Sequence, residues 1–252
     1  MPKIVSISNQ KGGVGKTTTT VNVCAYIGQQ YPTLLVDLDP QANATASLGV
    51  EVGERPSIHE VLVRGMNPRE AILPTSIPGL SLLPSSPSLV AGELELVPMM
   101  GREFKLRRAF QPIGDTYPYI FIDCPPALGL LTLNAFVASH KVLVPVQCEY
   151  LALEGLSELL TTIELVQLNL SPQLELGGII MTMYDARNAL SKQVVEEVRK
   201  HFSCTFRTVI PRNVRVAEAP SHGLSIMEYA PTSPAARAYR ELSEEIIAAL
   251  GA

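Results

Sequence analysis

The feature of this sequence that most restricts its fold is a glycine-rich loop between an apolar run and an amphipathic stretch. The loop spans residues 10–18, follows the apolar run Ile4–Ser8, and opens into Lys16–Gln29, where apolar residues recur at helical spacing. Glycines let successive backbone N–H groups converge on an anion, and the N-terminus of the following helix adds positive potential. The loop therefore predicts a phosphate-binding site. Its expected nucleotide contacts are Gln10, Lys11, Gly12, Gly13, Val14, Gly15, Lys16, Thr17 and Thr18.

Two side chains of this loop and two carboxylate segments predict a magnesium nucleotide site. Lys16 is expected to contact the β and γ phosphates, and the Thr17 hydroxyl is expected to bind Mg²⁺. Asp37 and Asp39 end one apolar run, and Asp123 ends another. Because ligands of parallel sheets bind at the carboxyl ends of the strands, these carboxylates are expected near the loop. Asp123 there is expected to hold Mg²⁺ through water.

Short apolar runs alternate with amphipathic stretches along most of the chain. This alternation predicts an α/β fold with one domain over residues 1–252, built on a mostly parallel, twisted sheet with helices on both faces. Residues 51–118 are the least regular, and we expect loops and short helices there. The expected strands are Ile4–Ser8, Thr33–Asp37, Leu80–Leu83, Tyr119–Asp123, Lys141–Val146, Leu176–Met183 and Arg207–Ile210. The expected helices are Lys16–Gln29, Ala152–Leu168, Leu190–His201 and Pro234–Leu250, with a capping box at Ser57–Glu60 and an N-cap at Ser233.

Composition and charge restrict the class of protein further. The chain has 252 residues, 46% of them hydrophobic, and no apolar run reaches the roughly 18–20 residues that a membrane-spanning helix needs. We therefore expect a globular cytoplasmic protein. Its four cysteines are scattered singly, which is typical of buried thiols in a reducing compartment. The net charge is −4, but residues 187–240 hold nine Lys and Arg against four Asp and Glu, so this segment is locally basic.

Six motifs along the chain together form a specific signature. They are KGGVGKTT at Lys11–Thr18, VDLDPQ at Val36–Gln41, IDCPP at Ile122–Pro126, VPVQCEYLALEGL at Val144–Leu156, MTMYDAR at Met181–Arg187 and IPRNVRVAEAPSHG at Ile210–Gly223. These motifs resemble the ParA/MinD family of deviant Walker A ATPases, in particular its chromosomal ParA branch, the Soj-like proteins. The resemblance covers Ile4 to about Pro234, with residues 51–118 weakly matched. It implies a single-domain P-loop NTPase fold and a slow ATPase that uses ATP and Mg²⁺.

The resemblance also implies catalytic roles. Lys16 serves the nucleotide of its own subunit, whereas Lys11 reaches the phosphates bound by a partner subunit, so that ATP holds a homodimer together. Asp39 is expected to orient the attacking water, and Asp123 is the expected Walker B acid. Asp37 is expected in the magnesium shell, although a strand-terminal aspartate of this kind also serves as a simple cap.

The same resemblance assigns base and DNA contacts to the second half of the chain. Pro211 and Asn213 are expected against adenine, with an ordinary turn as the alternative. The ATP-bound dimer is expected to bind double-stranded DNA without sequence preference. Arg187 and Arg215 match positions where Soj-like proteins carry DNA-binding arginines. The charge count alone adds five candidates, for which a solvated surface position is the alternative: Lys192, Arg199, Lys200, Arg212 and Arg240.

The family partner is ParB, so a ParB-like protein is expected to stimulate hydrolysis and release the protein from the nucleoid. Three alternatives stay open. A MinD-like positioning ATPase needs a basic amphipathic helix to bind membrane, but residues 240–250 are acidic, so we expect no membrane binding. An ATP-dependent small-molecule enzyme or an iron–sulfur carrier can use the same loop, with Cys124 and Cys148 as candidate thiols. A ParA-like ATPase can also position a protein cargo, which the sequence does not separate from chromosome partitioning.

Overall fold

Among the residues that the structure describes, eight strands form a single sheet in the order β3-β4-β2-β5-β1-β6-β7-β8. The computed structural model describes residues 2–149 and 154–251 of the chain. All neighbouring strands in this part of the chain run parallel except β3 and β4. The sheet is therefore mostly parallel, as the sequence predicts. The strands are β1 (Lys3–Ile7), β2 (Thr33–Asp37), β3 (Leu73–Pro74), β4 (Leu80–Leu83), β5 (Tyr119–Asp123), β6 (Lys141–Gln147), β7 (Glu175–Tyr184) and β8 (Thr205–Pro211).

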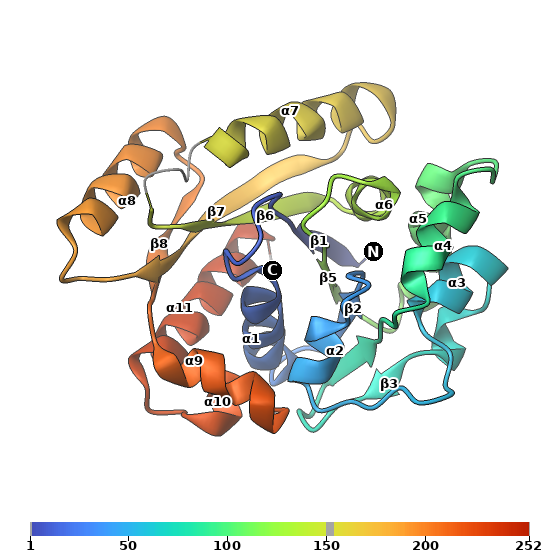
Figure 1. The fold of residues 1–252 in the computed structure, drawn as a ribbon, viewed down its shortest axis with the longest axis horizontal. Helices are drawn as coiled ribbons and strands as arrows, with labels where there is room; N and C mark the ends of the chain where they lie inside the picture. The colour runs from blue at the N-terminus through green and yellow to red at the C-terminus, as the bar shows by residue number, and fades with distance from the viewer. Residues whose placement is uncertain (1, 150–153, 252) are drawn as a thin grey trace.

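Helices cover both faces of this sheet. Figure 1 shows α1 and α11 on one side of β6 and β7, and α7 and α8 on the other. The helices are α1 (Lys16–Gly28), α2 (Asn43–Ser47), α3 (Ile58–Arg64), α4 (Leu89–Leu96), α5 (Lys105–Ala109), α6 (Leu130–Ala138), α7 (Glu154–Asn169), α8 (Ala189–His201), α9 (Val214–Glu218), α10 (Ile226–Tyr229) and α11 (Pro234–Ala249). Short 3-10 turns lie at Pro68–Glu70, Arg102–Phe104, Gln111–Ile113 and Ala219–His222.

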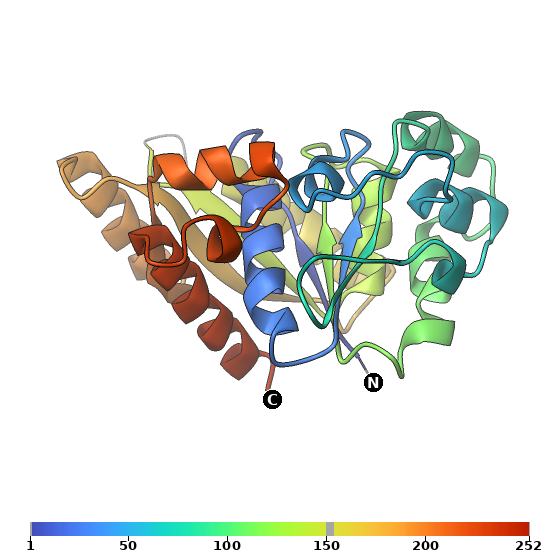
Figure 2. The same cartoon turned by 90° about the horizontal axis from the view of Figure 1, so that it is seen from below.

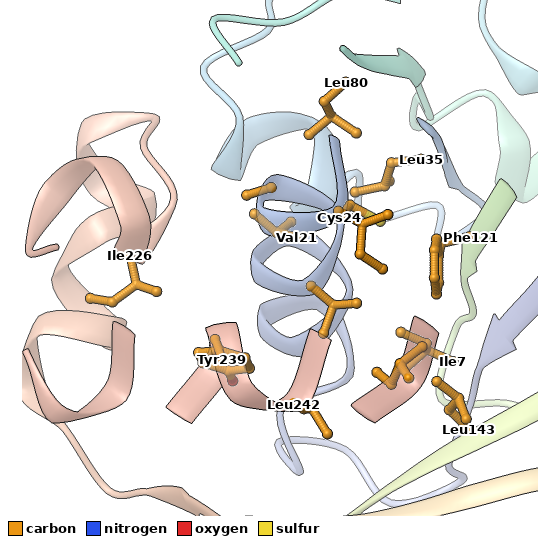
Figure 3. Close-up of a cluster of buried hydrophobic side chains, with 14 of the residues drawn as sticks. Ile7, Val21, Cys24, Leu35, Leu80, Phe121, Leu143, Ile226, Tyr239 and Leu242 are labelled. Carbon is orange, nitrogen blue, oxygen red and sulfur yellow. The ribbon is translucent and has the colours of Figure 1, made fainter. Parts of the chain in front are cut away.

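The alternation of side chains along the central strands divides the core into two layers. Ile7 and Phe121 pack with α1 and α11 on one face, where Tyr239 is also buried (Figure 3). Ile4 and Ile122 point to the opposite face, against α3 to α6. Fully burying one such side chain contributes about 1.5–3 kcal/mol. The packing fixes α1 on the sheet, and with it the loop that precedes α1.

The loop before α1 lies at the carboxyl ends of the parallel strands. In Figure 2 this edge of the sheet is opposite the edge where the chain begins and ends. The segments after β2 and β5 emerge at the same edge as the loop, because β1 pairs with β5 and β5 pairs with β2, all parallel. The fold thus brings the glycine-rich loop and the two carboxylate segments together.

All seven predicted strands are present, and three predicted helices match α1, α8 and α11 to within one residue at each end. The fourth, Ala152–Leu168, corresponds to α7, but residues 150–153 lie outside the described residues, and with them part of the motif at Val144–Leu156. The capping box at Ser57–Glu60 and the N-cap at Ser233 are both formed.

The sequence patterns do not predict α6 or β3. α6 is buried on most of its surface, so no polar face marks a helical period. β3 has only two residues, one of them a proline. Residues 51–118 contain short helices and turns as expected, together with the predicted strand β4 and the unpredicted β3.

Candidate nucleotide-binding site

The loop between β1 and α1 has the backbone of an anion cradle. Gly13 and Gly15 have φ angles of +74° and +88°, a left-handed conformation that glycine adopts without a steric penalty. Space is open beside Gly12 and Gly13, where an added Cβ meets no atom within 4 Å. α1 begins at Lys16, and no side chain caps its first turn in the described chain. The amides of that turn are therefore available to a phosphate.

Lys16 supplies a buried ammonium to this cradle. Lys16 is only 7% exposed, and its Nζ donates to the Lys11 carbonyl at 3.2 Å. Burial lowers the pKa of the Lys16 amine, and the negative charge of Asp123 partly offsets that effect. No carboxylate in the described chain forms an ion pair with this amine. An ammonium in that situation attracts an anionic ligand strongly, because little water screens it.

Asp123 lies beside Asp37 across two paired strands, and both carboxylates are buried. The Thr20 hydroxyl donates to Asp123 Oδ1 at 2.9 Å, whereas Oδ2 is buried with no hydrogen-bond partner among the described residues. Burial raises the pKa of Asp123 to about 7, the charge of Asp37 adds to the shift, and the Thr17 and Thr20 hydroxyls oppose it. A buried carboxylate oxygen without a donor suits a metal ion or its bound water. These residues therefore fit Mg²⁺.

Both carboxylate oxygens of Asp37 already accept hydrogen bonds from other residues of the chain. Its Oδ2 accepts hydrogen bonds from the Thr45 amide at 2.8 Å and the Thr45 hydroxyl at 2.7 Å, and its Oδ1 accepts from the Asp39 amide at 3.2 Å. Burial raises the pKa of Asp37 to about 6. Asp39 is 7% exposed and accepts a hydrogen bond from the Gln41 amide. Asp37 thus anchors α2 to β2, and its place in a magnesium shell stays a prediction.

A cavity of about 400 Å³ adjoins the loop on the side of β7 and β8. Pro211 and Asn213 both line it, together with Gly15 and Thr18 of the loop segment. The Asn213 Oδ1 caps α9 by accepting from the Arg215 amide at 2.9 Å, which leaves its amide nitrogen for another partner. Pro211 and Asn213, the two predicted base contacts, therefore line the same cavity as two residues of the predicted phosphate-binding loop.

Two further residues of this cavity have no sequence signal apart from the motif that contains them. Met183 lines the cavity with a φ of +54°, an uncommon conformation for a residue with a side chain. The buried hydroxyl of Thr182 donates to the Val14 carbonyl at 2.8 Å. β7 therefore holds the glycine-rich loop directly, although the two segments are far apart in the sequence.

Lys11 extends from the loop to the surface. Its side chain is 38% exposed, and its Nζ lies 3.8 Å from Glu149 Oε2 of the same chain. The ammonium is therefore outside the cradle that Lys16 occupies.

The seven predicted DNA-binding residues fall into two sets. Arg187, Arg212 and Arg215 lie just after β7 and β8, at the carboxyl edge of the sheet. Arg187 donates three hydrogen bonds to Asp185, two from its guanidinium and one from its backbone amide, and these bonds lower the pKa of that carboxyl to about 2. Arg215 pairs with Glu218 at 2.9 Å.

The other four residues lie elsewhere. Lys192, Arg199 and Lys200 are on α8, and Arg240 is on α11. Lys192 pairs with Glu196 at 3.9 Å, Lys200 pairs with Glu197 at 3.1 Å, and Arg199 donates to the Arg207 carbonyl.

The cysteines form no cluster. Among residues 2–149 and 154–251, no group of three or more His, Cys, Asp or Glu side chains is arranged to hold a metal ion. Burial raises the pKa of Cys148 to about 12 and also raises that of Cys124, so both thiols are neutral at physiological pH. Neutral, unclustered thiols give no support to an iron–sulfur site.

The chain is similar to known proteins over nearly its whole length. A protein-family model described as an AAA domain matches residues 2–176. The sporulation initiation inhibitor protein Soj of Bacillus subtilis is 50% identical over 98% of this chain and 99% of its own length. The chromosome-partitioning ATPase Soj of Thermus thermophilus is 50% identical over 97% of this chain and 95% of its own. A crystal structure of cobyrinic acid a,c-diamide synthase from Mycobacterium smegmatis, with bound ADP and magnesium, is 38% identical, covers 98% of this chain and 94% of that chain, and superposes with a TM-score of 0.86.

Proposed function

Because the chain belongs to the Soj/ParA family of partitioning ATPases, we propose that it binds and hydrolyses ATP with Mg²⁺ and that ATP controls its affinity for DNA. The observation that carries this proposal is the convergence at the start of α1 of the buried Lys16 ammonium, the open glycine loop and the unpartnered oxygen of Asp123. The Mycobacterium smegmatis relative, whose structure contains ADP and magnesium, supports the same ligands.

Each residue of the site has a task in this reaction. The free amides of α1 and the Lys16 ammonium bind the phosphates, and Pro211 and Asn213 hold the base in the adjoining cavity. Thr17 would bind Mg²⁺ directly and Asp123 would hold it through water, and the ion would neutralise charge that develops on the phosphate oxygens. Asp39 orients the attacking water. Its backbone is held by Asp37, so its position depends on the anchored start of α2.

Lys11 acts between subunits in this proposal. Its ammonium lies at the surface and outside its own phosphate cradle, which suits a contact with a second copy of the chain. A cation contributed to the partner's triphosphate makes dimerisation depend on ATP, because ADP lacks the γ-phosphate. Symmetry then provides two such contacts in each dimer.

DNA binding follows from the dimer. Arg187, Arg212 and Arg215 give one subunit only a few cations at the carboxyl edge of the sheet. Few phosphate contacts give weak binding at physiological salt, and a dimer doubles their number. A ParB-like partner that stimulates hydrolysis returns the protein to the weakly binding monomer. The protein is then found on the nucleoid while ATP is bound.

The test measures molar mass and DNA affinity together. Light scattering of the protein with ATP and Mg²⁺ should give a dimer, and with ADP a monomer. Fluorescence anisotropy should show equal affinity for two unrelated duplexes, with a steep decrease between about 50 and 200 mM salt. Equal DNA affinity with and without ATP contradicts the switch.

The membrane alternative has less structural support. α11 uses its apolar residues to pack against α1 and β8, so they are not available to a lipid surface. In the described part of the chain, no helix has the length and apolar character needed to span a bilayer.

A further inference from the structure

We propose that Asn9 and Glu149 are positioning residues for Lys11. Asn9 fixes the backbone from which the Lys11 side chain leaves the loop, and Glu149 pairs with the Lys11 ammonium within the same subunit until the partner's phosphates replace the carboxylate. The inference deepens the proposed function and rests on it, since it assumes that Lys11 acts across the subunit interface.

Asn9 ties the backbone of Lys11 to the sheet. Asn9 is 4% exposed, and both ends of its side-chain amide form hydrogen bonds. Its Nδ2 donates to the Pro145 carbonyl of β6 at 2.7 Å, and its Oδ1 accepts from the Lys11 amide at 2.9 Å. β6 lies between β1 and β7 in the interior of the sheet, so it is hydrogen-bonded on both sides and holds Asn9 in a defined position. A buried amide whose donor and acceptor are both paired holds one geometry, because breaking either bond leaves a polar group unsatisfied.

The other backbone group of Lys11 is also held. Its carbonyl accepts a hydrogen bond from the Lys16 ammonium at 3.2 Å. The backbone of Lys11 is therefore fixed at its N–H and at its C=O, while its side chain remains 38% exposed. This is the arrangement that a contact reaching out of the subunit needs, since only the side chain has to move.

Glu149 is the counter-ion of that side chain. The distance from Lys11 Nζ to Glu149 Oε2 is 3.8 Å, and the Glu149 side chain is 53% exposed. The side-chain amide of Gln147 donates from Nε2 to the other carboxylate oxygen, Oε1, at 2.5 Å. The backbone N–H of Glu149 donates to the backbone carbonyl of Gln147 at 2.8 Å. The carboxylate is thus hydrogen-bonded just beyond the end of β6, the strand that also holds Asn9.

The ion pair is weak enough to be exchanged. An exposed ion pair of this kind changes an equilibrium constant by only about 1.4- to 5-fold, since water screens it. The pair with Glu149 therefore opposes the transfer of Lys11 to a partner's phosphates by no more than that factor. A triphosphate with bound Mg²⁺ still carries more negative charge than one carboxylate, and it is less screened inside a subunit interface. Lys11 therefore leaves Glu149 when a partner's ATP is presented, and each dimer that forms breaks two such pairs.

Substitutions of the two positioning residues should change the dimerisation constant in opposite directions. Glu149→Gln removes the competing charge, so the dimerisation constant with an ATP analogue should increase by the square of the single-pair effect, about 2- to 30-fold. In Asn9→Leu, leucine has a shape similar to that of asparagine but forms neither hydrogen bond. This variant should weaken dimerisation at least about 10-fold, while the affinity of the monomer for the nucleotide changes less than about 3-fold. A residue that only stabilises the fold lowers both quantities together.

A matched control is available on the same sheet. Lys141 and Glu175 form a pair of the same length, 3.8 Å, with a similarly exposed glutamate. Lys141 and Glu175 are paired at the start of β6 and β7, opposite the nucleotide edge. Glu175→Gln makes the same change in net charge, and it should leave dimerisation unchanged.

The experiment is sedimentation equilibrium with a non-hydrolysable ATP analogue and Mg²⁺, combined with titration of a fluorescent ATP analogue into dilute monomer. If the wild type stays monomeric, or Lys11→Ala dimerises like it, the proposed function fails at the interface. If the wild type dimerises and Lys11→Ala does not, yet Glu149→Gln behaves like Glu175→Gln or dimerises more weakly, only the positioning role is overturned. Because Glu149 is exposed, this variant decides the outcome even if Asn9→Leu does not fold.

Discussion

Asp123→Asn should gain stability relative to the wild type as the pH of the nucleotide-free protein rises from 5 to 8, while it abolishes ATP hydrolysis. The Asp123 carboxylate is fully buried, one of its oxygens has no partner in the described chain, and burial raises its pKa from 3.8 to about 7. Between these values the folded state keeps a proton that the unfolded state has lost. Folding therefore takes up a proton in this window, and the stability of the wild type decreases as the pH rises through it.

The size of the effect follows from this shift. Linkage between a pKa of 3.8 in the unfolded chain and about 7 in the folded chain costs the wild type roughly 2–3 kcal/mol between pH 5 and pH 8. Asparagine does not ionise, so the variant lacks this cost. Its NH2 group leaves buried donors unpaired, but that penalty is the same at both pH values. The stability difference between variant and wild type should therefore move in favour of the variant by roughly 2–3 kcal/mol from pH 5 to pH 8, or about 5–10 °C in Tm.

The assay is thermal unfolding of the nucleotide-free protein, followed by circular dichroism at pH 5 and pH 8. Asp115→Asn is the matched control, because Asp115 is exposed and the change in charge is the same. It should give no pH-dependent gain. ATP hydrolysis by Asp123→Asn, measured as phosphate release, should fall to background. A difference between variant and wild type that is equal at the two pH values refutes the account of Asp123 as an uncompensated buried charge.

Four further substitutions test the individual roles of site residues. Lys16→Ala should reduce ATP affinity at least about 100-fold in equilibrium titration, since it removes the only buried ammonium of the cradle in the described chain. Lys11→Ala should bind ATP normally but remain monomeric in light scattering, and a dimer contradicts a role between subunits. Asp39→Ala should bind ATP and accumulate as a dimer, because the attacking water loses its orientation, and phosphate release should be nearly absent. Arg215→Ala should weaken DNA binding and reduce its salt dependence by about one or two ion equivalents per dimer, without a change in nucleotide affinity.

The nucleotide loop and most strands could be predicted from the sequence because their signals are local. Glycines at fixed offsets before Lys16 specify the backbone of the loop, and short apolar runs such as Tyr119–Asp123 are typical of parallel strands that are covered on both faces. The cap at Ser233 is equally local, since the serine and the amide it accepts from lie within one turn. The helix α6 could not be predicted in this way, because burial on most of its surface removes the polar face that marks a helical period.

The ion-pair partners of the charged residues could not be predicted from local sequence patterns either. The sequence shows Arg187 and Arg215 as cations, but not that Asp185 and Glu218 hold them in ion pairs. Arg199 and Lys200 add to the same local charge, yet they lie at the far end of α8 from the loops after β7 and β8. A count of charges contains no information on the direction in which each side chain points.

The sequence by itself determined the class of fold, the position of the phosphate loop and the carboxylates that follow the strands, since each depends on neighbours only a few residues away. The tertiary structure alone decided which of these groups meet. Thr182 supports Val14, Thr45 engages Asp37, and Glu149 faces Lys11, each across a long stretch of chain. Such contacts depend on how helices and strands pack in three dimensions, and packing sums many small interactions that no single segment of the sequence contains.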